Sequence, residues 1–129
     1  MVIAGIKGKK EQIVTKELTA EVVGSGTLPV YATPAMAALM EQTAYESVEP
    51  YLKEGEGTVG SLLNISHLSP SVVGAKIICE SELIQVEGKK LVFHVKASDE
   101  AGIIGEGEHV RFIISEEKFM EKAASKASC

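Results

Sequence analysis

Hydrophobic residues follow two different patterns in this chain of 129 residues, and the change falls near residue 57. Before that point, residues 33–48 form one run whose first half is apolar at nearly every position. After it, residues 58–66, 76–86, 91–97 and 103–114 are rich in β-branched residues. The two patterns predict one long helix followed by four strands.

The long helix is predicted to begin at Thr33-Pro34, because Thr is a good N-cap and Pro is favoured at the first helical position. Pro50 indicates a kink or an early end. A helix that is apolar nearly all round is usually buried on most sides. Ahead of it, the sequence predicts a short strand at residues 12–15, a turn or two of helix at residues 15–23 and a flexible loop at residues 24–29.

The connections between the last strands are short, and residues 87–90 and 99–102 have turn-like sequences that imply antiparallel hairpins. The order of elements favours an α+β fold with the helix packed against one antiparallel sheet. Residues 116–129 are expected to add a short helix and a polar tail, and residues 1–129 to form a single domain. One helix leaves part of the sheet open, so we expect a two-fold homodimer, with a tetramer left open.

Composition narrows the class of protein. The formal net charge of -5 argues against a general nucleic-acid binder, and no apolar run approaches the length of a membrane span. The apolar N-terminal residues precede Lys7, Lys9 and Lys10, the reverse of a secretory signal. Cys79 and Cys129 do not resemble a disulfide framework. We therefore expect a cytoplasmic protein that acts without a membrane or nucleic acid.

Glu41 and His67 are the first candidates for chemistry. Glu41 falls within the apolar helix, where a carboxylate is costly unless it is paired or functional; alternatively, it marks a polar edge that faces water. His67 closes a predicted strand, where side chains often reach a ligand, although a lone His is more often structural. His94 and His109 lie within later strands and are weaker candidates. The three histidines lack the spacing of a metal site, so no metal is expected.

Thr33 is the third candidate. N-capping alone would explain it, but its hydroxyl could also act beside the positive end of the helix, where an oxyanion or a thioester carbonyl is stabilised. Thr33 and Glu41 are eight residues apart, or about 12 Å along a helix axis. An imidazole with a hydrogen bond on each side spans about 7 Å, so a relay in which His67 bridges Thr33 and Glu41 is feasible.

The motifs together resemble a known family. The run Val30-Tyr31-Ala32-Thr33-Pro34-Ala35-Met36 with Glu41, and the run Thr58-Val59-Gly60 followed by Asn64-Ile65-Ser66-His67, resemble the fluoroacetyl-CoA thioesterase branch of the hot-dog superfamily. Gly105, Gly107-Glu108-His109 and Arg111 fit its terminal strands, so the resemblance covers about residues 9–122. It implies a hot-dog fold, in which a curved antiparallel sheet of about five strands wraps a long central helix, paired into dimers with active sites at the interface.

The resemblance also implies roles for individual residues. Glu41 would be the base, or the nucleophile that forms an anhydride, His67 would transfer protons, and Thr33 would orient or polarise the thioester. Gly60, Asn64 and Arg111 would bind substrate, with the Gly60 N–H directed at the carbonyl oxygen. The coenzyme A phosphates would need cations, for which the candidates are Lys76, Lys89, Lys90 and Lys118, although each is more often plain surface charge.

Two departures from the family bear on specificity. The fluoroacetyl-selective members carry a Phe in a lid before the helix, whereas residues 24–31 contain none, which argues against fluoroacetyl-CoA selectivity here. Ser71-Val72-Val73 stands where the family tends to have Thr-Pro, with Pro70 displaced. We expect hydrolysis of a short- or medium-chain acyl-CoA with no cofactor, since coenzyme A is part of the substrate. The alternatives are a non-catalytic acyl-CoA sensor and an enoyl-CoA hydratase of the same fold.

Overall fold

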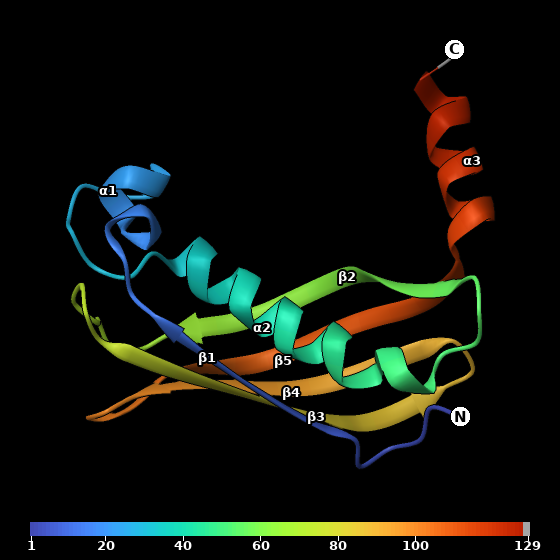
Figure 1. Cartoon of the computed structure of the whole chain (residues 1–129), viewed down its shortest axis with the longest axis horizontal. Coiled ribbons are helices and arrows are strands. Elements are labelled where there is room, and N and C mark those ends of the chain that lie inside the picture. The colour runs from blue at the N-terminus through green and yellow to red at the C-terminus, as the bar shows by residue number, and fades with distance from the viewer. Residues whose placement is uncertain (128–129) are drawn as a thin grey trace.

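The computed structural model describes residues 1–127, and the end of the expected polar tail, with Cys129, lies outside the described residues. One curved antiparallel sheet wraps around one long helix, α2, as Figure 1 shows. The strand order is β1-β3-β4-β5-β2, so β1 and β2 form the two edges. The strands are β1 (Lys7–Ile13), β2 (Glu56–His67), β3 (Lys76–Glu87), β4 (Lys90–Asp99) and β5 (Gly102–Ser115). This is the predicted hot-dog arrangement, and the α+β prediction is confirmed.

Helix α2 (Thr33–Val48) begins and ends where the sequence predicts, with Pro50 inside the following 3-10 turn η2 (Glu49–Tyr51). Its buried side chains recur at spacings of three and four along one face: Met36, Leu39, Met40, Thr43, Ala44 and Val48. They pack against inward-facing residues of the sheet, including Leu83, Phe93 and Ile104. Gly8 lets β1 lie close to α2, because a Cβ at this position would be 2.7 Å from the Thr43 carbonyl oxygen.

The prediction that the helix is buried on most sides is wrong for this chain. Pro34, Ala38 and Gln42 are exposed on the face that points away from the sheet. The reason is that one sheet can cover only one side of a helix. The exposed side carries small apolar residues such as Ala38, so no charged residue in the sequence indicates that this side faces solvent. An exposed apolar strip therefore runs beside the first half of α2.

The N-terminal section differs from the prediction in detail. The first strand lies at Lys7–Ile13 instead of residues 12–15, because its sequence is largely polar and its conformation is set by pairing with β3. The short helical region is divided into η1 (Lys16–Leu18) and α1 (Ala20–Val23), with Thr19 extended between them. The C-terminal helix α3 (Glu116–Ala127) projects away from the sheet (Figure 1). Within residues 1–127, no helix is both long and apolar enough to cross a membrane.

Candidate active site

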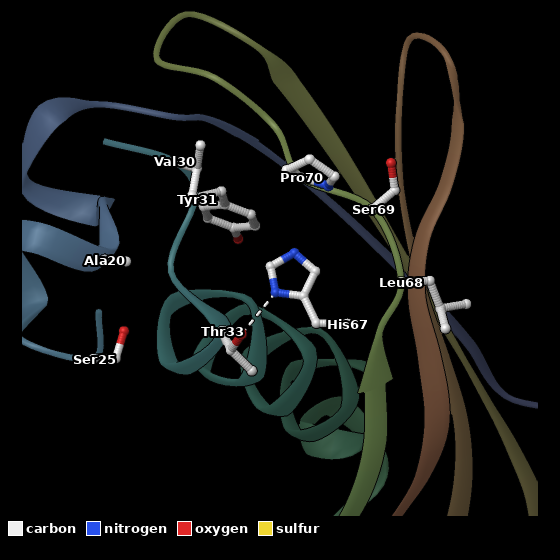
Figure 2. A pocket seen from close by; sticks show the side chains of 9 residues that line it. All are labelled: Ala20, Ser25, Val30, Tyr31, Thr33, His67, Leu68, Ser69 and Pro70. Atoms are coloured by element: carbon white, nitrogen blue, oxygen red, sulfur yellow. Dashed lines mark hydrogen bonds between the residues drawn. The ribbon is translucent and has the colours of Figure 1, made fainter. Parts of the chain in front are cut away.

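The start of α2 meets the end of β2, and this junction brings Thr33 and His67 together. Thr33 Oγ1 lies 2.7 Å from His67 Nδ1, a hydrogen bond drawn in Figure 2. The prediction that Thr33 caps the helix is wrong, because Ala32 is the N-cap residue and Thr33 is the first residue of the helix. The Thr33 hydroxyl therefore forms a hydrogen bond with His67 and does not cap the helix.

The other ring nitrogen of His67 is buried without a partner. Its Nε2 atom makes no hydrogen bond within residues 1–127, although it is shielded from solvent. It points away from Thr33, toward the side where Tyr31 and Pro70 lie (Figure 2). Burial lowers the pKa of His67, and the nearby backbone of Ser69 opposes part of that shift. The neutral imidazole is therefore favoured near pH 7, and it can exchange a proton with a group that enters the site.

Tyr31 forms a rigid side of the site, next to the His67 ring. Its ring meets the His67 ring edge-on, with the centroids 6.3 Å apart. The Tyr31 hydroxyl donates a 2.5 Å hydrogen bond to Gln12 Oε1, and the side chain is almost completely buried. Buried aromatic rings with a satisfied hydroxyl are rigid elements of a core. The His67 ring is thus held between a hydroxyl on one side and a fixed aromatic ring on another.

An open cavity of about 300 Å³ adjoins these side chains. The residues that line it come from α1 and the chain between α1 and α2, the first residue of α2, the last residue of β2 and the loop that follows it: Ala20, Ser25, Val30, Tyr31, Thr33, His67, Leu68, Ser69 and Pro70. The lining is mostly apolar, with hydroxyl groups and the imidazole at separate points (Figure 2). Such a mixture suits a small apolar group attached to a polar centre, and the volume is at the lower end for ligand sites.

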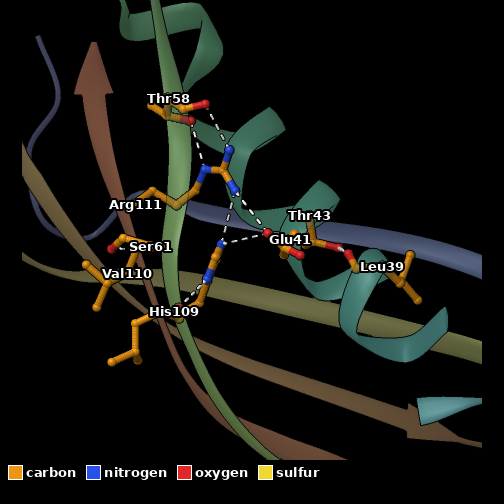
Figure 3. Close-up of polar contacts among 9 residues, drawn as sticks. Leu39, Glu41, Thr43, Thr58, Ser61, His109, Val110 and Arg111 are labelled. Carbon is orange, nitrogen blue, oxygen red and sulfur yellow. Dashed lines mark hydrogen bonds and ion pairs between the residues drawn. The ribbon is translucent and has the colours of Figure 1, made fainter. Parts of the chain in front are cut away.

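Glu41 lies further along α2 and belongs to a different cluster. Its Oε1 atom is 3.6 Å from Arg111 Nη1 and 4.0 Å from His109 Nε2. Figure 3 marks both contacts with dashed lines. The Glu41 side chain keeps 43% of its surface exposed, whereas those of Arg111 and His109 are buried. The carboxylate therefore combines a charged partner on the protein side with access from solvent. Glu41 is therefore both ion-paired and partly exposed to water, so each of the two interpretations from the sequence is partly right.

Arg111 is held from several sides. Its Nε donates to Thr58 Oγ1 at 2.8 Å and its Nη2 to the Thr58 carbonyl oxygen at 2.9 Å. The guanidinium also lies 5.4 Å from the centroid of the Tyr45 ring, a cation–π distance. Burial lowers the pKa of Arg111, while Glu41 and Tyr45 oppose that shift. Because guanidinium stays charged in proteins, Arg111 is a fixed cation beside Glu41.

Gly60 has no side chain, and the space beside its Cα is occupied by Glu41, His109 and Arg111. A Cβ at Gly60 would lie 2.8 Å from Glu41 Oε1, 3.2 Å from His109 Cε1 and 3.3 Å from Arg111 Nη1. The register between β2 and β5 also shifts here, since Gly60 pairs with Arg111 and Leu62 with Val110. Bulges of this kind re-aim side chains next to functional sites. The glycine backbone therefore borders the carboxylate directly.

The predicted site residues thus fall into two clusters within the chain. Thr33 and His67 form the first, and Glu41, Arg111 and Gly60 form the second. The feasible relay in which His67 bridges Thr33 and Glu41 is not formed in the described chain. His67 binds Thr33, whereas Glu41 pairs with Arg111 and lies near His109, both from β5.

Asn64 and the four lysines lie outside both clusters. The exposed Asn64 side chain makes no hydrogen bond within residues 1–127. Lys76 begins β3 just after the loop that follows His67, and it forms a 3.1 Å ion pair with Glu11. Lys89 and Lys90 lie near the opposite end of the sheet, where Lys90 pairs with Phe112, and Lys118 is in α3. Of these four lysines, Lys76 alone lies at the end of the sheet where His67 closes β2.

His109 was a weak candidate by sequence, yet it touches the second cluster. Its Nε2 lies 3.1 Å from Arg111 Nη1 and its Nδ1 lies 2.8 Å from the Leu62 carbonyl oxygen. The signal that could have found it is the spacing of His109 and Arg111, since residues two apart on a strand face the same side. Both were expected on a strand, but nothing in the sequence indicated that this face meets Glu41.

Fold and site together define the class of hot-dog thioesterases. The structure superposes on the solved fluoroacetyl-CoA thioesterase FlK with a TM-score of 0.91, at 30% identity over 98% of both chains. A thioesterase superfamily member from Thermus thermophilus also gives a TM-score of 0.91, at 28% identity over 99% of this chain and 95% of that one. FlK variants have been solved with acetyl-CoA and with fluoroacetate and CoA.

The family follows from the sequence match. Residues 14–117 match the fluoroacetyl-CoA-specific thioesterase family. The fluoroacetyl-CoA thioesterase of Streptantibioticus cattleyicolor is 37% identical over 97 residues, which make up 75% of this chain and 70% of that protein. The chain therefore belongs to the fluoroacetyl-CoA-specific thioesterase family, as its motifs predicted, and it is a thioester hydrolase by family.

Proposed function

We propose that the chain hydrolyses a short- or medium-chain acyl-CoA thioester to the free acid and coenzyme A. Membership of a thioesterase family supports the reaction type. The observation that carries the choice of residues is the Thr33–His67 hydrogen bond beside a cavity of about 300 Å³. A cavity of that size favours a short acyl group over a long one.

In this proposal Glu41 acts as the general base. It accepts a proton from water, whose oxygen attacks the thioester carbonyl carbon, and the C–S bond then breaks as the thiolate leaves and takes up a proton. His67 transfers that proton and Thr33 orients the thioester. The Gly60 N–H donates to the carbonyl oxygen as negative charge develops on it, and Asn64 and Arg111 hold the substrate.

The alternative is a covalent route. Glu41 would attack the carbonyl carbon, release the coenzyme A thiol and form a mixed anhydride that water then hydrolyses. A single turnover in 18-oxygen water tests the covalent route, because only an anhydride can leave label in the Glu41 carboxylate. Label in Glu41 after one turnover would establish the covalent route, whereas unlabelled Glu41 would exclude only an anhydride whose Glu41 carbonyl carbon is attacked by water.

A homodimer would complete this site. β2 is an edge strand, it carries the half-exposed Leu62, and the exposed face of α2 lies beside it. An open edge with apolar neighbours is suited to pairing with a second copy. In such a dimer the His67 cluster of one protomer would work with the Glu41 cluster of its partner. Light scattering on the purified chain gives the oligomeric state and distinguishes a dimer from a tetramer.

A mixing experiment tests whether the two clusters come from different protomers. Glu41→Ala and His67→Ala should each be inactive alone. Refolding them together should restore about a quarter of wild-type activity, because half of the dimers are mixed and each mixed dimer has one intact site. If the mixture stays inactive while native mass spectrometry, with one variant isotope-labelled, shows mixed dimers, both clusters must act within one protomer.

Thiol release is the direct test of the function. We would assay acyl-CoA substrates from acetyl to decanoyl, with fluoroacetyl-CoA included, for wild type and for His67→Ala. Turnover that depends on His67 supports hydrolysis, and the chain-length optimum describes the cavity. If no substrate releases thiol but calorimetry shows tight acyl-CoA binding that Glu41→Ala does not change, the chain is a sensor. A cytoplasmic location stays a prediction from the cysteine pattern.

A further inference from the structure

We propose that His109 is a positioning residue for Glu41: it accepts a hydrogen bond from Arg111 and so fixes the guanidinium that faces the carboxylate. This inference rests on the proposed hydrolysis at Glu41. The chain of contacts begins at the Leu62 carbonyl oxygen, which the imidazole contacts. It continues from the imidazole to Arg111 Nη1 and from there to Glu41 Oε1 (Figure 3). No step of that chain touches the Thr33–His67 pair.

The partners of His109 assign its tautomer. A carbonyl oxygen can only accept, so the 2.8 Å contact with Leu62 requires a hydrogen on Nδ1. A guanidinium can only donate, so the 3.1 Å contact with Arg111 Nη1 requires a lone pair on Nε2. His109 is therefore neutral with both nitrogens occupied. A proton on Nε2 would break the Arg111 contact and place two cations together.

The surroundings hold the ring in this state. His109 is 1% exposed, and its ring stacks on Phe93 with 6.2 Å between the centroids. Burial lowers the pKa of His109, and the Arg111 cation lowers it further, whereas the Leu62 carbonyl and Glu41 oppose the shift. A ring that neither moves nor titrates near neutral pH cannot shuttle protons, but it is well suited to orient a neighbour.

Arg111 depends on this acceptor. Its Nε and Nη2 atoms are occupied by Thr58, so Nη1 is the nitrogen that faces both His109 and Glu41. Without the imidazole lone pair, a buried N–H of Arg111 would lose its partner, and the guanidinium would turn to find another. The partly exposed Glu41 carboxylate would then no longer be held in one orientation by Arg111. Small displacements of a reacting group have large kinetic effects.

Two substitutions separate the functions of the two ring nitrogens. In His109→Gln the side-chain oxygen can occupy the place of Nε2 and accept from Arg111. In His109→Asn the shorter amide can still donate to Leu62 but does not reach Arg111. We expect kcat to fall about 100-fold in His109→Asn with KM changed less than about threefold, and His109→Gln to stay within about fivefold of wild type. His94→Asn, on the exposed face of β4, is the matched control and should be unchanged.

A spectroscopic readout tests the same inference without activity. Long-range proton–nitrogen correlation spectra of the imidazoles in the wild-type protein should show His109 with hydrogen on Nδ1 alone from about pH 6 to 8. Hydrogen on Nε2, or a wild-type kcat in His109→Asn, would overturn the proposal. If the wild type releases no thiol but the Nδ1–H tautomer is found, the proposed hydrolysis fails, and the catalytic part of this inference with it, while the His109–Arg111 hydrogen bond stands.

Discussion

Thr33 Oγ1 and His67 Nδ1, from residues 34 positions apart in the sequence, are joined by a 2.7 Å hydrogen bond. One residue opens α2 and the other closes β2, so the bond forms only when the helix is seated against the sheet. It selects one orientation of the His67 ring and leaves Nε2 free of protein partners in the described chain. The site is thus oriented by the packing of α2 on the sheet.

This bond predicts the effect of changes at Thr33. Thr33→Val keeps the shape of the side chain and removes the hydroxyl, so the His67 ring loses its anchor. We expect kcat/KM for the best acyl-CoA substrate to fall at least about 10-fold, which corresponds to the loss of one hydrogen bond of about 1.4 kcal/mol in the transition state. Thr33→Ser retains the hydroxyl and should stay within about threefold. Equal activity in both variants would mean that the hydrogen bond has no catalytic role.

Gly60→Ala should damage the Glu41 cluster with little effect on folding. The new methyl group would lie 2.8 Å from Glu41 Oε1, so the exposed carboxylate must swing away. We expect kcat to fall about 100-fold, measured by thiol release. Gly57→Ala on the same strand is the control, because its Cβ would meet only the flexible end of Glu116 at 3.0 Å or more. Similar losses in both variants would point to a general distortion of β2.

The fold could be predicted because local signals and topology agree. The apolar run from Thr33, the β-branched segments after residue 57 and the short turns each specify one element, and these short connections leave few arrangements of a helix on a sheet. β1 was misplaced because Lys7–Ile13 has almost no apolar alternation. Its strand conformation comes from pairing with β3, which no local pattern records.

The site could be predicted only in part. Motifs identified Thr33, Glu41 and His67, but their contacts depend on which strands lie beside α2. The order of the sheet places β5 next to β2, and this brings Arg111 and His109 to Glu41. A two-residue spacing in a strand shows that His109 and Arg111 share a face, but the partner of that face is decided by tertiary packing.

Tyr31→Phe should separate stability from activity. The change removes the hydroxyl that donates to Gln12 Oε1, and it keeps the ring that meets His67 edge-on. We expect the free energy of unfolding to fall by about 1–2 kcal/mol, because a partly buried acceptor loses its partner. Activity at 25 °C should stay within about threefold. Urea denaturation gives the first quantity and thiol release the second; a large loss of activity with unchanged stability would assign the Tyr31 hydroxyl to the reaction itself.

Stability should fall as the solution becomes acidic, through the half-buried His67 and the buried His109. Burial lowers the pKa of both His67 and His109 in the folded chain, whereas in the unfolded chain each titrates near its ordinary value of about 6.5. Between the lowered pKa and about 6.5 the unfolded state binds more protons than the folded state. The free energy of unfolding therefore decreases as pH falls through this window, by at most about 1.4 kcal/mol per pH unit for each histidine.

Urea denaturation at pH 7 and pH 5, at one protein concentration, measures this effect. Removing the titrating ring in His109→Gln should reduce the difference between the two pH values, whereas His94→Gln on the exposed face of β4 should not. Asp99 gives a separate acid effect: its hydrogen bond from Ser71 lowers its pKa, and that contribution is lost as pH falls from the ordinary value of about 3.9 through the lowered pKa. Equal stability of the wild type at pH 7 and pH 5 would contradict a neutral, buried His109.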